Sequence, residues 1–149
     1  ADEKAILNRE YGISEFDIEI IKLERIFIDK IFAVQFYYER EMYEDVSKHL
    51  YDISIMINND DIKRLLKDNK ELNKLINYKR KEETLRIGGI PDTKKIVDFD
   101  YFKLEFNEDL INAFNKMQNV YVMDDESKIT FDDVKVTIKI LLDIFKKCN

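Results

Sequence analysis

Apolar side chains recur along the chain at intervals of three and four residues, the spacing of helices that bury one face. The first such stripe begins at Leu23 and the last begins after Thr130, which forms a capping-box pattern with Asp133. The pattern predicts helices over four ranges: 23–41, 43–57, 107–120 and 131–147. We therefore expect a mainly α protein.

The segments between these stripes are polar or irregular. Asn58-Asn59-Asp60 interrupts the second stripe, and Asp60 is predicted to cap the helix or helices that cover 61–86. Residues 88–103 follow no regular period, and residues 123–127 are predicted to form a loop. Three glycines and one proline are too few for a many-stranded β fold, which further favours long helices.

One short segment has a different period. From Glu15 to Ile20 apolar and acidic residues alternate, which predicts a half-buried β-strand. A lone strand needs partners, either from a short strand elsewhere in this chain or from sequence that is missing, and we expect it to belong to a missing sheet. We expect a single helical domain over 1–149, with a strand-containing lead-in over 1–22 and a helical bundle over 23–149, as the C-terminal lobe of a longer protein. The first residue is Ala1, which fits either removal of the initiator methionine or a chain that begins inside a longer reading frame.

Composition narrows the class of protein. With 45% hydrophobic and 38% charged residues in 149, the chain can form a core, and its longest uncharged run, 31–38, is far too short to span a membrane. Cys148 is the single cysteine and His49 the single histidine, so an intrachain disulfide and a zinc site of several cysteines and histidines are excluded. We expect a cytoplasmic protein with no membrane partner.

The charge is distributed unevenly. The net charge is −6, yet residues 61–95 hold 11 basic and 6 acidic side chains. Within them, basic residues recur at helical spacing and predict a cationic face: Lys63, Arg64, Lys67, Lys70 and Lys74. This face is either a solvated helix surface or a surface that binds phosphates, as an RNA-binding helical domain would. The acidic segments on either side would also suit a helical module that binds a protein partner.

Two charged residues interrupt apolar stripes. Lys30 lies on the face formed by Phe27, Ile31 and Val34, where it either extends its ammonium to water at the helix edge or binds phosphate in a cleft. Asp52 lies at the border of the next stripe and either pairs with Lys48 four residues earlier or has a role in a site.

Other candidate sites are weaker. His49 is either a hydrogen-bonded boundary residue or a ligand or base. Asp98 and Asp100 form an Asp-x-Asp pair in an irregular segment, and Gly88-Gly89 precedes Ile90-Pro91 rather than a helix suited to phosphate binding. Neither feature predicts a metal site in this chain.

The stretch 16–57 resembles the C-terminal half of the AbiEii/AbiGii family of nucleotidyltransferase toxins. In that family a strand leads into a helix with an Arg-Thr-Phe-like turn and a lysine, and the next helix carries an Arg-His/Asp-x-Tyr-Asp-Leu signature. Leu23-Glu24-Arg25-Ile26-Phe27-Ile28-Asp29-Lys30-Ile31 resembles the first, and Lys48-His49-Leu50-Tyr51-Asp52-Ile53 resembles the second. The chain has Ile26 where the family often has Thr, and Lys48 where it usually has Arg.

The resemblance implies an enzyme that transfers a nucleotide from an NTP to an acceptor, with tRNA as an acceptor class, in a toxin–antitoxin or phage-defence pair. It implies Lys30 and Asp52 as catalytic residues, and Lys30 and Lys48 as nucleotide-binding residues. Mg²⁺ would be held by an upstream domain with a Gly-Gly-Ser/Thr and an Asp-x-Asp motif, neither of which precedes Lys30 here. The implied partners are that N-terminal domain, the NTP, tRNA bound through 61–95 and a cognate antitoxin, and the chain alone should be inactive.

Overall fold

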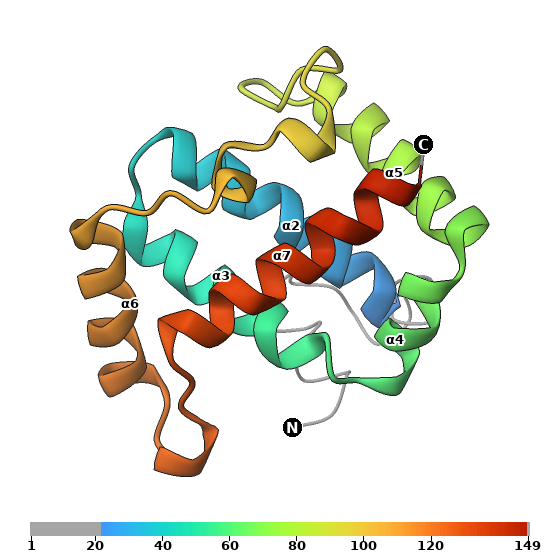
Figure 1. Cartoon of the computed structure of the whole chain (residues 1–149). Helices are drawn as coiled ribbons and strands as arrows, with labels where there is room; N and C mark the ends of the chain where they lie inside the picture. The colour runs from blue at the N-terminus through green and yellow to red at the C-terminus, as the bar shows by residue number, and fades with distance from the viewer. Residues whose placement is uncertain (1–21, 149) are drawn as a thin grey trace, which may run out of the picture.

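The computed structural model describes residues 22–148, which form a helical domain (Figure 1). The elements follow in the order α2 (Leu23–Glu39), α3 (Tyr43–Met56), α4 (Asp60–Lys67), α5 (Asn69–Leu85), two 3₁₀ turns, α6 (Glu108–Tyr121), a 3₁₀ turn η4 (Asp125–Ser127) and α7 (Phe131–Lys147). The mainly α prediction is confirmed. The described residues contain no strand, and the strand predicted at Glu15–Ile20 lies outside them.

Helix α2 is the centre of the fold. It packs against α3, α4, α5 and the 3₁₀ turn η3 (Asp100–Lys103), and residues on nearly all of its sides are buried. A helix that is apolar over such a wide arc is stable only when other elements surround it. The other helices are arranged around α2, with α6 beside α3 at one edge and α7 running diagonally across the front of Figure 1.

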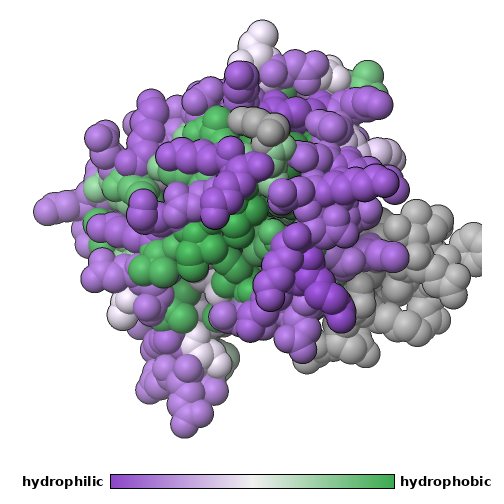
Figure 2. All heavy atoms as spheres, turned by 45° about the vertical axis from the view of Figure 1, so that its right-hand side comes forward, coloured by the Kyte–Doolittle hydropathy of each residue, from purple (hydrophilic) through white to green (hydrophobic). Residues whose placement is uncertain are grey.

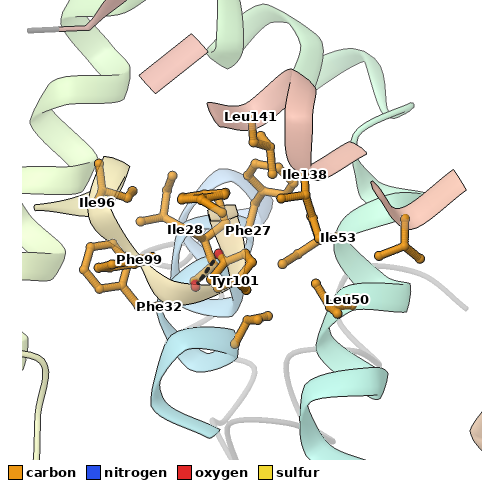
Figure 3. Close-up of a cluster of buried hydrophobic side chains, with 14 of the residues drawn as sticks. Phe27, Ile28, Phe32, Leu50, Ile53, Ile96, Phe99, Tyr101, Ile138 and Leu141 are labelled. Atoms are coloured by element: carbon orange, nitrogen blue, oxygen red, sulfur yellow. Dashed lines mark hydrogen bonds between the residues drawn. The ribbon is translucent and has the colours of Figure 1, made fainter. Parts of the chain in front are cut away.

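The core forms where α2, α3 and α7 meet the irregular segment that follows α5. Figure 3 shows that side chains from all four converge: Phe27, Ile28, Phe32, Leu50, Ile53, Ile96, Phe99, Tyr101, Ile138 and Leu141. Tyr101 is fully enclosed, and its hydroxyl donates a 2.8 Å hydrogen bond to the carbonyl of Ile31 in α2. Burial raises the pKa of Tyr101 well above its ordinary value.

The irregular segment predicted over 88–103 contains the two 3₁₀ turns, η2 (Ile96–Asp98) and η3. It is held to α2 by Gln35, which donates to the Asp100 carboxylate at 2.8 Å and accepts from the Asp100 backbone N–H at 2.7 Å. Burial acts to raise the pKa of Asp100, but the hydrogen bonds from Gln35 and Lys94 outweigh it and lower that pKa. These contacts fix one edge of the segment to the central helix.

The helix starts differ from the predictions in one place. Asn59, rather than Asp60, is the N-cap of α4, and its side chain accepts from the N–H groups of Asp61 and Ile62. Residues 61–86 then form two helices, because Asp68 leaves helical geometry and caps α5 through the N–H of Glu71. At α7 the predicted capping box of Thr130 and Asp133 is present in full.

The surface is rich in charged side chains. Figure 2 shows apolar side chains gathered in a band across the side of the molecule that it faces, between charged side chains. On α7, Val136 and Ile140 are exposed. None of the helices in 22–148 has both the length and the apolar character needed to cross a lipid bilayer.

Candidate functional site

Lys30 and Asp52, the two charged residues that interrupt apolar stripes, form an ion pair in the structure. The ammonium of Lys30, on α2, donates a 2.9 Å hydrogen bond to Oδ2 of Asp52, on α3. The Lys30 side chain is only 5% exposed, whereas that of Asp52 is 38% exposed. The sequence left two alternatives for Lys30, extension of its ammonium to water or a position in a cleft. The first does not hold, because the ammonium is buried beside a carboxylate.

Lys30 lies at a cleft of about 500 Å³, which is the size of a small-molecule site. Its lining combines cations, an acid and rings: Asp29, Lys30, Phe32, Ala33, Phe36, Tyr37, His49, Lys79 and Arg86. The rings of Tyr37 and His49 stack, with centroids 5.7 Å apart and planes 12° apart. The cleft therefore offers both positive groups for an anion and aromatic surface for a planar group.

A second set of charges lines the cleft from α5. Lys79 lies 3.4 Å from Oδ1 of Asp29 and 3.5 Å from Oε2 of Glu83, and its side chain is 12% exposed. Glu83 is buried, and its other oxygen accepts from Arg86 at 2.9 Å and from the backbone N–H of Ile90 at 3.2 Å. One buried carboxylate thus holds two cations and the returning chain in fixed positions.

The turn at Gly88-Gly89 makes this arrangement sterically feasible. Gly88 adopts φ +76°, a conformation that side chains disfavour. At Gly89 an added Cβ would overlap the backbone carbonyl of Glu83, so only glycine lets the chain pass over the end of α5. The two glycines therefore have a structural role, which agrees with their unsuitability as a phosphate loop.

Lys48, the other predicted nucleotide-binding residue, is not among the residues that line the cleft. Its ammonium lies 3.5 Å from Glu44 and 4.3 Å from the ring centre of Tyr121 on α6. The Tyr121 hydroxyl, and then the charge of Glu44, raise the pKa of Lys48. Of its two possible partners four residues away, Lys48 pairs with Glu44, while Asp52 pairs with Lys30.

The Asp-x-Asp pair does not form a cation site. Asp100 is engaged by Lys94, 3.1 Å from its Oδ1, and by Gln35. Among residues 22–148, no group of three or more His, Cys, Asp and Glu side chains is arranged to hold a metal ion.

The predicted cationic face is divided between two helices. Lys63, Arg64 and Lys67 are exposed on α4, whereas Lys70 and Lys74 are exposed on α5 after the break at Asp68. Exposure of these residues fits both a solvated surface and a surface that binds phosphates.

Several residues of the cleft were not identified from the sequence. Glu83, Arg86 and Lys79 belong to a run of charged residues on α5, where nothing in the local pattern separates a buried charge from an exposed one. The available signal was the pair of glycines, since a sharp turn directly after a charged helix brings the chain back onto that helix.

Comparison with known proteins gave no match: no family model, curated protein or solved structure matches the chain.

Proposed function

We propose that the chain is the C-terminal helical portion of an AbiEii-like nucleotidyltransferase, the toxin of a toxin–antitoxin or phage-defence pair. The observation that supports this most is the hydrogen bond between Lys30 and Asp52, which lie 22 residues apart on two helices. The family resemblance assigns both residues to one site, and Lys30 also lies at the cleft. A buried lysine held by a carboxylate is also the kind of group that functional sites use.

In the proposed reaction, a hydroxyl of the acceptor attacks the α-phosphorus of an NTP. A new phosphorus–oxygen bond forms as the hydroxyl proton passes to solvent, the bond to the bridging oxygen of the β-phosphate breaks, and pyrophosphate leaves. The ammonium of Lys30 would bind phosphate oxygens and offset the charge that builds up there. Asp52 would act as a positioning residue, because its hydrogen bond fixes where the ammonium lies.

The proposal assigns Mg²⁺ to the upstream domain. Residues 22–148 do not fit a magnesium site, since the carboxylates near the cleft are paired with lysine and arginine. We therefore derive no step through Mg²⁺ from this chain, and we expect the 149 residues alone to transfer no nucleotide. The proposed partners are the N-terminal nucleotidyltransferase domain, tRNA on the basic residues of 61–95, and a cognate antitoxin.

A second candidate function is a non-catalytic module that binds a protein partner. It is favoured by apolar side chains at the end of α6, where Val120 is 61%, Tyr121 55% and Met123 93% exposed. Large apolar groups in one place on a surface are typical of interaction sites. Recovery of a stoichiometric protein partner, lost in a Met123→Asp variant, together with no nucleotide binding, would favour this function over transfer.

The coding sequence on the 5′ side of the codon for Ala1 tests the family assignment. An in-frame continuation of about a domain's length, with Gly-Gly-Ser/Thr followed by Asp-x-Asp, is the expected result. A start codon directly before Ala1 would contradict the proposal and favour the interaction module. Transfer of label from an NTP by the 149 residues alone would also contradict it.

A further inference from the structure

Two arginines, Arg40 and Arg86, lie against one aromatic ring of the Lys30 cleft, that of Phe36. Phe36, near the end of α2, lines the cleft together with Arg86. The guanidinium carbon of Arg40 lies 3.7 Å from the centre of the Phe36 ring, and that of Arg86 lies 4.8 Å from it. The residues that follow α2 and α5, Arg40 and Arg86, thus contact the same aromatic ring.

Each guanidinium is held by a different set of contacts. Arg40 donates to the carbonyl of Phe36 at 2.8 Å and to the carbonyl of Gly88 at 3.2 Å. An added Cβ at Gly88 would lie only 3.3 Å from Arg40, so the absence of a side chain there allows the close approach. Arg86 is held by the buried carboxylate of Glu83.

The charge of Arg40 is only weakly offset by these contacts. Among residues 22–148, its hydrogen-bond partners are carbonyls, and the carboxylate paired with it, that of Glu39, is 4.0 Å away. Its side chain is 37% exposed, and that of Arg86 is 49% exposed. Both cations therefore remain accessible to a ligand in solvent.

An arginine stacked on an aromatic ring has a fixed plane. Of the five N–H donors of Arg40, two donate to carbonyls and the other three stay available. Two N–H donors on one edge of a guanidinium match two oxygens of one phosphate. Two arginines fixed in this way on Phe36, a residue of the Lys30 cleft, can bind phosphate groups with little loss of side-chain entropy.

We propose that Arg40 and Arg86, held by Phe36, form a second phosphate-binding subsite beside the Lys30 cleft, whose lining includes Phe36 and Arg86. This inference rests on the proposed function in that it places the subsite beside the phosphate site assigned to Lys30. The shared chemistry is a phosphate group, whose source is either the triphosphate of the NTP or the backbone of a nucleic-acid acceptor. Phe36 is a positioning residue, because it acts on the ligand only through the two arginines.

Isothermal titration calorimetry of the 149-residue chain tests the subsite with two probes, inorganic tripolyphosphate and a single-stranded RNA of five nucleotides without terminal phosphate. The variants are Arg40→Lys and Arg86→Lys, which keep the charge but lose the planar, two-pronged donor. Lys139→Arg is the control, because Lys139 is an exposed cation on α7, outside the basic residues of 61–95. Phe36→Leu removes the stacking and leaves every charge in place.

We expect each arginine variant, and Phe36→Leu, to weaken binding of at least one probe by about tenfold or more, with the Lys139→Arg control unchanged. An effect on tripolyphosphate identifies the NTP as the source, and an effect on RNA alone identifies the acceptor. Affinities that match the control for both probes would overturn the subsite, as would the absence of binding by the wild-type chain. Near-ultraviolet circular dichroism of each variant confirms that the fold is retained, and the exposed Arg86 provides a readout even if Arg40→Lys disturbs the turn.

Lys30→Met separates this inference from the proposed function. If Lys30→Met binds tripolyphosphate like wild type while the arginine variants do not, the subsite stands and the role proposed for Lys30 fails. If Lys30→Met loses binding while the arginine variants match the control, the subsite is overturned and the role of Lys30 stands.

Discussion

The pairing of Lys30 with Asp52 predicts unequal costs for removing its two members. Asp52→Ala leaves a cation whose side chain is 5% exposed without the carboxylate that lies 2.9 Å from it. Lys30→Met keeps an unbranched chain of similar length in the core and leaves behind a carboxylate that is 38% exposed and can be hydrated. Removing one member of a fully buried pair costs about 3–5 kcal/mol because the other charge stays buried without compensation, whereas the carboxylate left by Lys30→Met can be solvated.

The exposure of Asp52 reduces these values, because solvent screens the pair. We expect Asp52→Ala to lower the free energy of unfolding by about 2 kcal/mol and Lys30→Met to change it by less than about 1 kcal/mol. In the Lys30→Met background, Asp52→Ala should cost less than about 0.5 kcal/mol, because no buried cation remains. The coupling energy between the two sites is therefore about 1.5 kcal/mol.

Urea unfolding of the four proteins in this double-mutant cycle, followed by far-ultraviolet circular dichroism at pH 7, measures these differences. Equal slopes with urea concentration across the four would show that the denatured states are comparable. Equal costs of Asp52→Ala in both backgrounds would refute the reasoning, because the two side chains would then act independently.

Three further predictions concern the frame around the cleft. Gly89→Ala should destabilise the protein by more than about 2 kcal/mol, because the new Cβ would overlap the Glu83 carbonyl, and a melting temperature close to wild type would contradict this. Asp100 has a lowered pKa, so its stabilising effect is present above its unfolded pKa and is lost as pH falls through its folded pKa. The difference in unfolding free energy between wild type and Asp100→Asn should therefore shrink from pH 6 to pH 3. A constant difference would contradict this prediction. Tyr101 has a raised pKa, so its contribution to stability is present below about pH 10 and is lost as pH rises above that value. Tyr101→Phe should cost about 1–2 kcal/mol at pH 7, because the hydrogen bond to Ile31 is lost. Above pH 10 the unfolding free energy of the variant should fall less steeply with pH than that of wild type.

The sequence predicted the helices well because their signals are local. The stripe spacing, the cap at Thr130 and the irregular segment after the glycines all depend on residues within a few positions of one another. The break at Asp68 was missed although it also carries a local signal, since Asp68 precedes Glu71 by three residues, as in a capping pattern.

The candidate site was predictable only where a charge broke an apolar pattern. Lys30 and Asp52 both did so, and the structure brings them together. Glu83 and Arg86 did not, because α5 is charged on most of its surface and the burial of Glu83 arises only when the chain returns over the helix at Gly89. The choice of partner for Lys48 was likewise undetermined locally, since Glu44 and Asp52 are equally spaced from it and Tyr121 comes from a distant helix.

The most direct test of the central claim is nucleotide transfer by the product of the whole gene. Transfer of label from an α-³²P-labelled NTP to tRNA is compared for wild type, Lys30→Met and Lys48→Met, with stability measured for each. We expect wild type to label the acceptor, Lys30→Met to lose transfer while remaining folded, and Lys48→Met to lose much less, because its ammonium lies with Glu44 and Tyr121 rather than at the cleft. Full transfer by folded Lys30→Met would contradict the account.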